Sequence, residues 1–365
     1  MPAPGPDPVD SSARAAGPAP DLIGSSAAVG SSARAAGPAP VIVVGGGIAG
    51  VACARRLHDA GVPVRLLERA HRLGGRMASR TEEVADSPHV VDIGAPYFTV
   101  RDPGFAAVVD GWEAAGLVRP WTDTFTRSGP AGETGPVSGP TRWASTGGLR
   151  ATVEALAAGL DVRLETTVSE VTENLIVDGE NAAAVVLAMP DPQAARLLPA
   201  RVAQELGVAT GESTPVLTVW AAWPHRWWQS FDGIFVADSS VLTWLADSGR
   251  ARADGAAVLV AHTTGAFAAE HLDDPLSAVP RVMDELRHVV GGFHGSVPPP
   301  LWEKVHRWSL ASARRPHPEP FTLTEGPHPI AVCGDGWGPR SRVEQAWSSG
   351  DGLARELVGR LAVPL

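Results

Sequence analysis

The sequence predicts an α/β protein in which a parallel sheet and a mixed sheet are built from interleaved parts of one chain. Three observations lead to this expectation. Residues 41–68 read as strand, turn, helix and strand, residues 214–262 are mostly strand-like, and a strand at 330–335 leads into a closing helix. At 365 residues the chain exceeds the length at which one hydrophobic core usually divides, so we expect two domains.

The first elements form a compact unit. The run VIVV at 41–44 is apolar throughout, as in a buried strand, and GGGIAG at 45–50 is a turn. VACARRLHDAG at 51–61 predicts a helix that Gly61 closes, and VPVRLLE at 62–68 predicts a second strand. These lengths are typical of a β-α-β unit with parallel strands.

The later elements follow from the same patterns. We expect helices at 103–116, 147–159, 277–292 and 343–362. We expect strands at 161–168, 174–179, 183–190, 214–223, 232–238, 240–247, 256–262 and 330–335. Residues 128–140 are rich in glycine and proline and predict a loop.

Residues 1–40 differ in composition from the rest. They consist mainly of Ala, Pro, Gly and Ser, and the decapeptide SSARAAGPAP occurs unchanged at 11–20 and 31–40. Such a segment has too few apolar side chains to bury a core. We therefore expect a disordered tail that arose by duplication, in preference to a docking arm.

Composition excludes several kinds of partner. The net charge of −10 and pI of about 5.6 argue against nucleic acid and anionic membranes, because phosphate binding needs clustered Lys and Arg. Cys53 and Cys333 are too few for a disulfide framework, and no metal-binding motif is present, so no metal is expected. With no apolar run of about 18 residues and no signal-peptide pattern, we expect a cytoplasmic protein.

The turn at 45–50 contains the G-x-G-x-x-G pattern. In a chain with 40 glycines about 0.5 such matches are expected by chance, so only the context is informative. Here the pattern leaves a strand and enters a helix: Gly45 permits the turn, Gly47 admits a pyrophosphate and Gly50 allows close helix packing. Glu68 ends the next strand, where a carboxylate binds ribose hydroxyls. A Rossmann-like dinucleotide site follows, and the helix start adds Ile48 and Ala49 to it.

A second segment favours FAD over NAD. Directly after Glu68, residues 69–80 read RAHRLGGRMASR. This resembles the second fingerprint of the flavin-containing amine oxidase superfamily, in which the glycine pair passes close to the flavin and the arginine reaches the pyrophosphate. The resemblance implies cofactor contacts by Arg69, Gly74, Gly75, Arg76 and Met77.

The C-terminal segment AVCGDGWGPRSRVEQAWSSG, residues 331–350, is similar to the last flavin segment of that superfamily. In the superfamily a Gly-Asp pair binds ribityl or pyrophosphate groups, and the helix that follows points its N-terminus at the flavin pyrimidine. The dipole at that end stabilises negative charge on the ring. The expected contacts are Gly334, Asp335, Arg342, Val343, Glu344 and Ala346, together with Val168.

These resemblances imply a domain layout. It consists of a Rossmann-like FAD-binding domain of the amine oxidase or glutathione-reductase-like type and an interleaved α+β substrate domain with a mixed sheet. We assign the FAD-binding domain to 41–93, 141–192 and 325–365, and the substrate domain to 94–140 and 193–324.

The run VVDIGAPYFTVRDPGF, residues 90–105, identifies a branch. It resembles the D-x-G-A-x-Y-F-T-x-R-D-P-x-F signature of renalase-like bacterial flavoproteins, with Pro96 where that family usually has glutamine. GGRMAS, VVLAMPDPQAARLL (185–198) and VHRWSLA (305–311) match as well, so the resemblance spans 41–365. It implies an oxidase that takes hydride from isomeric, misreduced dihydronicotinamide nucleotides, passes the electrons to O₂ and releases H₂O₂. We expect a monomer or homodimer.

Two alternatives stay open. The first is an amine oxidase acting on a small amine; many such enzymes have a lysine facing the flavin, but the strand at 214–220 has none, and Lys304 is the only lysine. Neither cysteine falls where some amine oxidases tether the flavin, so FAD is expected to be non-covalent. The second is an FAD-binding protein without turnover, which Pro96 favours because proline lacks an N–H donor.

Substrate contacts are less defined, because hydride transfer needs alignment more than acid–base groups. Aromatic faces can sandwich a nicotinamide, although any one of Trp220, Trp223, Trp227, Trp228, Trp244 and Trp308 is more often a packing residue. Arg142 fits a surface salt bridge better than a substrate phosphate. The pocket candidates are Pro96, Tyr97, Trp143, His262 and Trp308.

Overall fold

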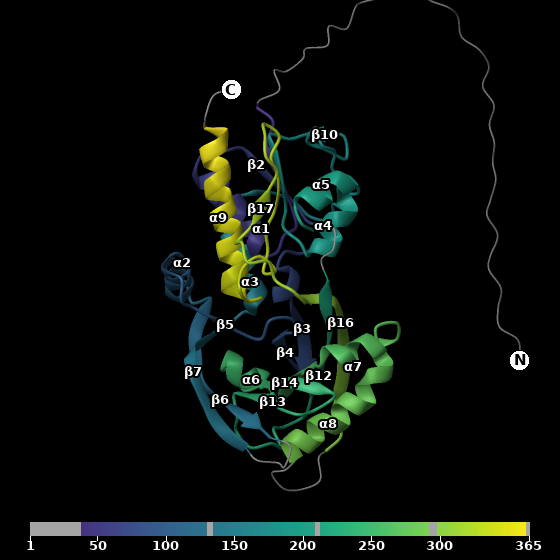
Figure 1. Ribbon diagram of the computed structural model, residues 1–365. Coiled ribbons are helices and arrows are strands. Elements are labelled where there is room, and N and C mark those ends of the chain that lie inside the picture. The colour runs from purple at the N-terminus through teal and green to yellow at the C-terminus, as the bar shows by residue number, and fades with distance from the viewer. Residues whose placement is uncertain (1–37, 130–133, 209–211, 292–297, 363–365) are drawn as a thin grey trace, which may run out of the picture. The chain divides into compact units, whose positions relative to one another are not determined.

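The computed structural model describes residues 38–129, 134–208, 212–291 and 298–362 (Figure 1). All but the last three residues of the predicted tail 1–40 lie outside the described residues. Within the described ranges, no helix combines the length and the apolar character needed to cross a membrane.

A six-stranded sheet contains the first β-α-β unit. Its order is β17-β18-β11-β1-β2-β8, and every neighbouring pair is parallel except β17 with β18. This sheet confirms the predicted Rossmann-like α/β fold. The strands are β1 (Val41–Val44), β2 (Val64–Leu67), β8 (Asp161–Arg163), β11 (Ala184–Leu187), β17 (Thr322–Leu323) and β18 (Ile330–Val332).

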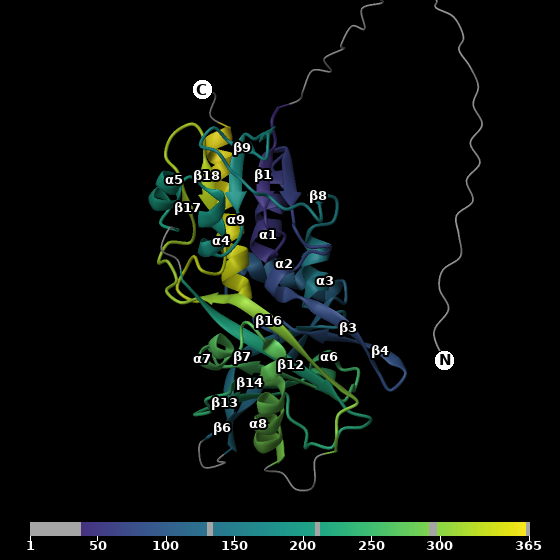
Figure 2. The ribbon, with the colours of Figure 1, turned by 90° about the vertical axis from the view of Figure 1, so that its right-hand side faces the viewer.

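Helices cover both faces of this sheet, as Figures 1 and 2 show. Val41 and Val43 belong to a core shared with helices α1, α3 and α9, while Ile42 and Val44 belong to a second core shared with α4 and α5. Burial on both faces explains why β1 is apolar at every position. The helices are α1 (Ile48–Asp59), α3 (Leu149–Leu156), α4 (Asp191–Leu197), α5 (Ala200–Glu205) and α9 (Val343–Leu361).

The second sheet has eight strands in the order β16-β12-β15-β14-β13-β6-β7-β5. Only β13 and β6 are parallel neighbours, so the sheet is mixed, as predicted. Helices α7 (Gly265–Glu270) and α8 (Val279–Gly291) pack on one face, with the 3₁₀ turn η2 (Pro275–Ala278) beside them. The strands are β5 (Phe98–Thr99), β6 (Val118–Ser128), β7 (Thr134–Ser145), β12 (Ser213–Ala222), β13 (Gly233–Val236), β14 (Leu242–Asp247), β15 (Val258–Thr263) and β16 (Trp302–Ala313).

The predicted loop at 128–140 is wrong, because β7 begins at Thr134 and pairs with β6 along its length. Two proline residues, Pro136 and Pro140, are tolerated there because β5 pairs only with residues 142 and 143, which leaves the other edge of that stretch open. The predicted strands 161–168 and 174–179 shrink to β8 and to β9 (Ile176–Val177), which pairs with β10 (Glu180–Asn181).

The described strands also bear on the domain boundaries. β7 runs across the boundary placed at residue 141, and β17 of the six-stranded sheet precedes the one placed at 325. The two-domain division itself stays a prediction.

A hairpin connects the two sheets. Its strands are β3 (Ser79–Val84) and β4 (Ser87–Asp92). Glu82 accepts a hydrogen bond from Trp220 Nε1 at 3.1 Å and pairs with the ammonium group of Lys304 on β16. At the base of the hairpin, Asp92 forms an ion pair with Arg252, and both side chains are buried. Asp92 also accepts from Ser79 Oγ at 2.6 Å and from the N–H of Leu149 at 2.9 Å.

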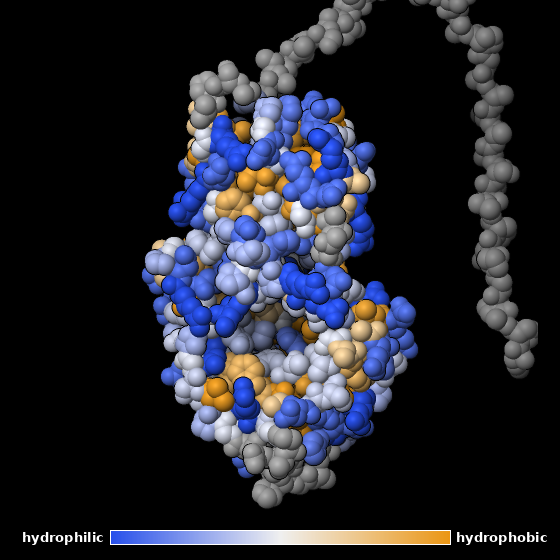
Figure 3. Space-filling view, viewed as in Figure 1, coloured by the Kyte–Doolittle hydropathy of each residue, from blue (hydrophilic) through white to orange (hydrophobic). Residues whose placement is uncertain are grey.

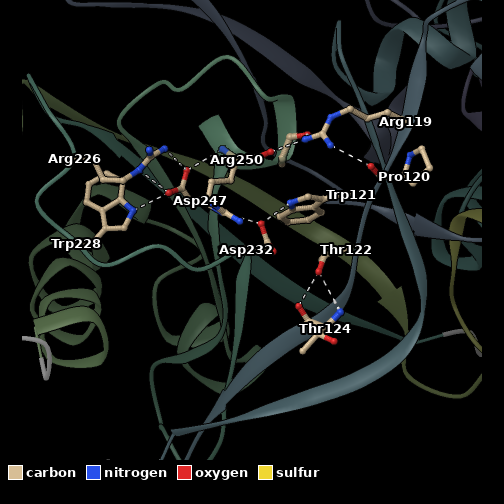
Figure 4. A network of polar contacts seen from close by, with 11 residues as sticks. Arg119, Pro120, Trp121, Thr122, Thr124, Arg226, Trp228, Asp232, Asp247 and Arg250 are labelled. Carbon is tan, nitrogen blue, oxygen red and sulfur yellow. Dashed lines mark hydrogen bonds and ion pairs between the residues drawn. The ribbon is translucent and has the colours of Figure 1, made fainter.

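Arg252 ends the short helix α6 (Ser248–Arg252), which a polar network holds in place (Figure 4). Asp247 caps its N-terminus and is fully buried, accepting from Arg250 N–H at 3.0 Å and from Trp228 Nε1 at 2.8 Å. Burial raises the pKa of Asp247, while Trp228 and Arg226 oppose that shift. Arg119 donates to the carbonyl oxygens of Arg250 and Ala251 at 2.6 and 2.8 Å, so both ends of α6 are satisfied.

Candidate active site

A cavity of about 380 Å³ lies between the six-stranded sheet and the eight-stranded sheet. Figure 3 shows the surface hollowed between these two parts of the described chain. One wall comes from the glycine-rich turn, the Gly74–Met77 segment and the start of α9. The other comes from β12, β15, β16 and residues 94–96.

The glycine-rich turn forms part of the first wall for steric reasons. Gly45 has φ +113°, and a Cβ on Gly50 would come within 2.0 Å of the Gly45 carbonyl oxygen. A Cβ on Gly47, by contrast, would meet nothing within 4 Å. Gly47 is also the N-cap of α1 and provides no side chain, so the first-turn N–H groups face the cavity, which Ile48 and Ala49 also line.

Glu68 follows β2 and braces this turn. Its carboxylate accepts the N–H of Gly46 at 2.6 Å and that of Ala70 at 2.8 Å. It lies outside the cavity lining, so its predicted ribose contact stays a prediction. The neighbouring Arg69 is exposed and does not line the cavity either.

Arg76 and Asp335 meet although 259 positions separate them. They form a two-point ion pair in which Arg76 Nη1 lies 3.0 Å from Asp335 Oδ2, and Arg76 Nη1 also donates to the Ala311 carbonyl at 2.9 Å. Ser341 Oγ donates to the same carboxylate. Both residues line the cavity, with Gly74, Met77 and Gly334 beside them, whereas Gly75 does not.

The start of α9 completes this wall. Arg342, Val343 and Ala346 line the cavity, and Arg342 is an N-cap whose side chain makes no capping hydrogen bond. Glu344 points elsewhere, accepting the N–H of Asp102 at 2.7 Å. Val168 is buried in the second core and does not reach the cavity.

The opposite wall carries Val216 and Thr218 on β12, His262 on β15 and Trp308 on β16. Trp308 Nε1 donates to the Ile93 carbonyl at 3.0 Å and to Thr218 Oγ1 at 3.2 Å, so the indole is held at the wall. Pro96 lines the cavity beside Ala95. Three of the five pocket candidates, Pro96, His262 and Trp308, therefore lie together.

His262 is the titratable group of this wall. Burial lowers its pKa to about 4, so its imidazole is neutral near pH 7. Its Nε2 atom is enclosed and has no hydrogen-bond partner among the described residues. A neutral ring offers one donor and one acceptor nitrogen.

The other two pocket candidates lie outside the lining. Tyr97 packs in an aromatic cluster, 5.3 Å from Phe125 and 5.7 Å from Trp244 between ring centroids, and burial raises its pKa. Trp143 stacks on Phe98 at 6.4 Å in the first core. Both expectations of a lining role are therefore wrong, because these rings fill apolar space between elements.

Arg142 also differs from expectation. Only 5% exposed, it makes no salt bridge within the described part of the chain and instead lies over the Phe125 ring at 4.2 Å and donates to the Asp123 carbonyl. Sequence reasoning missed several lining residues as well, namely Ala188, Met189, Val216, Thr218, Ala311, Ser312 and Ser341. For Val216 and Thr218 the alternation along a predicted strand was an available signal.

Two families match the chain. Residues 43–111 match the NAD(P)-binding Rossmann-like domain, and residues 115–358 match the flavin containing amine oxidoreductase family.

Three solved structures illustrate the likeness. Cyclohexylamine oxidase from Brevibacterium oxydans IH-35A is 14% identical, with a TM-score of 0.70 over 90% of this chain and 100% of that one. Wild-type putrescine oxidase bound to putrescine is 17% identical, with a TM-score of 0.68 over 88% and 99%. A putative protoporphyrinogen oxidase from Exiguobacterium sp. 255-15 is 14% identical, with a TM-score of 0.63 over 88% and 98%. At these identities the likeness shows a common fold.

The wall fits the cofactor that the family implies. Two helix N-termini, those of α1 and α9, reach the cavity without a side-chain cap, and Gly47 leaves open space where a side chain would project. Such ends bind anionic groups, as a dinucleotide requires. FAD is therefore the cofactor, and the family further implies a small-molecule substrate and O₂ as electron acceptor.

The match at 115–358 covers well over half of the 365 residues. It includes β12, β15 and β16 of one cavity wall and the start of α9 in the other. The chain thus belongs to the flavin containing amine oxidoreductase family.

Proposed function

We propose that the protein is a renalase-like oxidase that takes hydride from isomeric dihydronicotinamide nucleotides. The observation that supports this proposal most is the absence, among the described residues, of acidic side chains from the cavity wall that faces the FAD-binding segments, which carries Val216, Thr218, His262 and Trp308. The one carboxylate of the described chain that lines the cavity, Asp335, lies on the opposite wall with the FAD-binding segments and is already paired with Arg76 and Ser341. A small amine is a cation for which a free carboxylate is a strong partner, whereas an uncharged dihydronicotinamide ring can pack on such a wall.

The position of the only lysine gives further support. Lys304 on β16 lies opposite Trp220 of β12 and pairs with Glu82 of the β3–β4 hairpin. It lies outside the cavity lining. The β12 side chains that face the cavity are Val216 and Thr218. The lysine that many amine oxidases place before the flavin therefore has no counterpart on this wall.

Residues of this chain supply alignment and exclude water. Trp308, fixed by the Ile93 carbonyl and Thr218, presents an indole on which a nicotinamide ring can stack. Ile48, Met77, Val216 and Val343 give the cavity apolar surface. The Gly47 turn, Arg76 and the start of α9 would hold FAD, and FAD would supply the hydride acceptor and transfer the electrons to O₂ with release of H₂O₂.

Two alternative functions are each favoured by one observation. Oxidation of a small amine is favoured by the structural likeness to putrescine oxidase and cyclohexylamine oxidase. FAD binding without turnover is favoured by Pro96, which occupies the cavity wall without a polar side chain. In each case we keep the expectation of a cytoplasmic bacterial monomer or homodimer with non-covalent FAD.

The deciding experiment is an anaerobic titration of the purified flavoprotein, with the oxidised flavin absorption band as readout. Misreduced dihydronicotinamide isomers should bleach the band rapidly, while ordinary NADH and a panel of small amines should not. Bleaching by an amine alone would move the protein to the amine oxidase reaction. No bleaching by any compound would favour FAD binding without turnover. The Pro96→Gln variant then tests whether the proline is the cause.

A further inference from the structure

Two arginine residues of the described chain line the cavity, and they differ in what they contact. The guanidinium group of Arg76 is occupied, because it pairs with Asp335 and donates to the Ala311 carbonyl at 2.9 Å. The guanidinium group of Arg342 makes no ion pair or hydrogen bond with any other described residue. Arg342 is half-buried and lines the cavity, so its N–H donors are accessible to a ligand there.

The carboxylates closest to Arg342 along the chain have other partners. Asp335, seven positions earlier, is paired with Arg76. Glu344, two positions later, accepts the N–H of Asp102 at 2.7 Å. Arg342 therefore adds a positive charge to the cavity wall that no carboxylate of the described chain neutralises through an ion pair.

The Arg342 side chain extends from the start of α9 toward the eight-stranded sheet. Arg342 is the N-cap of α9, but its side chain is not used in capping, so the first-turn N–H groups stay available to the cofactor. Burial raises the pKa of Tyr97, and the guanidinium groups of Arg142 and Arg342 oppose that shift, which places both charges near the Tyr97 hydroxyl. Tyr97 follows the wall residue Pro96 and packs on Phe125 of β6, with ring centroids 5.3 Å apart.

This accessible guanidinium group defines the chemistry of its ligand. Its planar N–H donors match two oxygen atoms of one anion, and such charge-assisted hydrogen bonds are about twice as strong as neutral ones. A cationic amine would be repelled. In a nicotinamide nucleotide the 5′-phosphate of the ribose has the matching chemistry. The pyrophosphate of FAD, by contrast, is expected at the glycine-rich turn before α1.

We propose that Arg342 is a specificity-determining residue that binds the 5′-phosphate of a nicotinamide nucleotide substrate. In this arrangement the phosphate oxygens accept from the guanidinium group, and the nicotinamide ring packs on the wall that carries Val216, His262 and Trp308. The inference rests on the proposed function, since the phosphate is that of the dihydronicotinamide nucleotide.

The test compares two oxidised ligands that differ only in this phosphate, nicotinamide mononucleotide and nicotinamide riboside. Binding to the oxidised FAD-loaded protein is followed by perturbation of the flavin spectrum, so no turnover is needed. Wild type should bind the mononucleotide at least about ten-fold more tightly than the riboside, the effect of hydrogen bonds to a charged group. The net charge of −10 alone would favour the opposite order, because the riboside is a cation and the mononucleotide an anion.

Arg342→Gln should lower the affinity for the mononucleotide to that for the riboside and leave riboside binding unchanged. Arg342→Lys keeps the charge without the planar set of donors and should retain part of the preference. Arg340→Gln is the matched control. It removes the same charge from an exposed residue two positions earlier that does not line the cavity, so both dissociation constants should stay unchanged.

FAD content after gel filtration separates a substrate contact from a cofactor contact. Arg342→Gln should retain as much FAD as wild type. Loss of FAD from this variant, an unchanged preference for the mononucleotide in it, or no such preference in wild type would each overturn the inference. The proposed function survives these results if the misreduced isomers still bleach the flavin, and it fails with the inference if they do not.

Discussion

At the scale of single residues, Glu68 is both part of the dinucleotide-binding sequence pattern and a support of the glycine-rich turn. Its carboxylate bonds the N–H groups of Gly46 and Ala70, so it holds the end of β2 against the glycine-rich turn. The same half-buried carboxylate is the predicted ribose ligand.

We predict that Glu68→Ala loses most of its FAD. Loss of a charged hydrogen-bond acceptor should raise the dissociation constant of FAD by roughly 10- to 100-fold. The FAD-to-protein absorbance ratio after gel filtration measures this effect. Glu83→Ala, which removes an exposed carboxylate from β3, is the control and should retain FAD. Retention equal to wild type in Glu68→Ala would disprove the ribose assignment.

Residues set by local backbone motifs could be predicted from the sequence, and those set by distant contacts could not. Gly47, Arg76, Gly334 and Asp335 lie in the cavity wall because short fingerprints fix the backbone there. The pairing of Arg76 with Asp335, however, depends on how the two ends of the chain meet. Tyr97 and Trp143 were misassigned because an aromatic ring packs equally well in a core or in a pocket.

At the scale of elements, the turn between β1 and α1 contains two glycine residues that are needed for different reasons. Gly50 is required by the fold, since its Cβ position is filled by the Gly45 carbonyl oxygen at 2.0 Å. Gly47 faces the cavity with nothing within 4 Å.

This contrast predicts opposite phenotypes. Gly47→Ala should fold with an apoprotein melting temperature close to wild type and yet lose FAD affinity by at least about ten-fold, because the added methyl enters the cavity wall. Gly50→Ala should lower the unfolding free energy by about 2 kcal/mol or more through overpacking against the β1 turn. Urea denaturation of apoprotein and FAD titration measure the two effects. Full FAD affinity in a folded Gly47→Ala would refute the role of this turn.

Elements with strong hydrophobic periodicity were predicted well, and the β6–β7 hairpin was not. Glycine and proline at 128–140 indicate a loop when the chain is considered alone. Residues 134–140 form the first part of β7 because β6 provides backbone partners and the proline positions face an open edge. Local sequence does not encode that long-range pairing.

At the scale of the whole described chain, the Asp92–Arg252 pair joins the β3–β4 hairpin to helix α6, next to the eight-stranded sheet. Arg252 is 2% exposed at its side chain and also donates to the Val90 carbonyl at 2.6 Å. The pair lies at the base of the hairpin that leads into residues 94–96 of the wall.

We predict that Arg252→Met destabilises the protein by about 3–5 kcal/mol, because it leaves a buried carboxylate without its cation. Arg201→Met, which breaks an exposed pair with Glu173, should cost less than about 1 kcal/mol. Urea unfolding curves of both variants provide the comparison. An Arg252→Met variant as stable as wild type would show that the Asp92–Arg252 pair does not stabilise the fold.

The overall architecture was predictable because its signals lie at both ends of the chain and agree on one cofactor. The wall facing the flavin was not, since Thr218, His262 and Trp308 come together only through strand pairing across the sheet. The absence of acidic side chains from the described residues of that wall arises from the same strand pairing.

The packing of α9 on α1 has a consequence for synthesis on the ribosome. Gly350 lies so close to α1 that a Cβ would come within 2.0 Å of the Ala49 carbonyl, and Arg56 pairs with Asp351 at 2.7 Å. The apolar side of α1 is complete by residue 59, but α9 begins only at residue 343. At a synthesis rate of roughly 5–20 residues per second, the apolar side of α1 remains without α9 for on the order of 15 to 60 s. During that interval the nascent chain is a natural client for chaperones that bind exposed apolar helices.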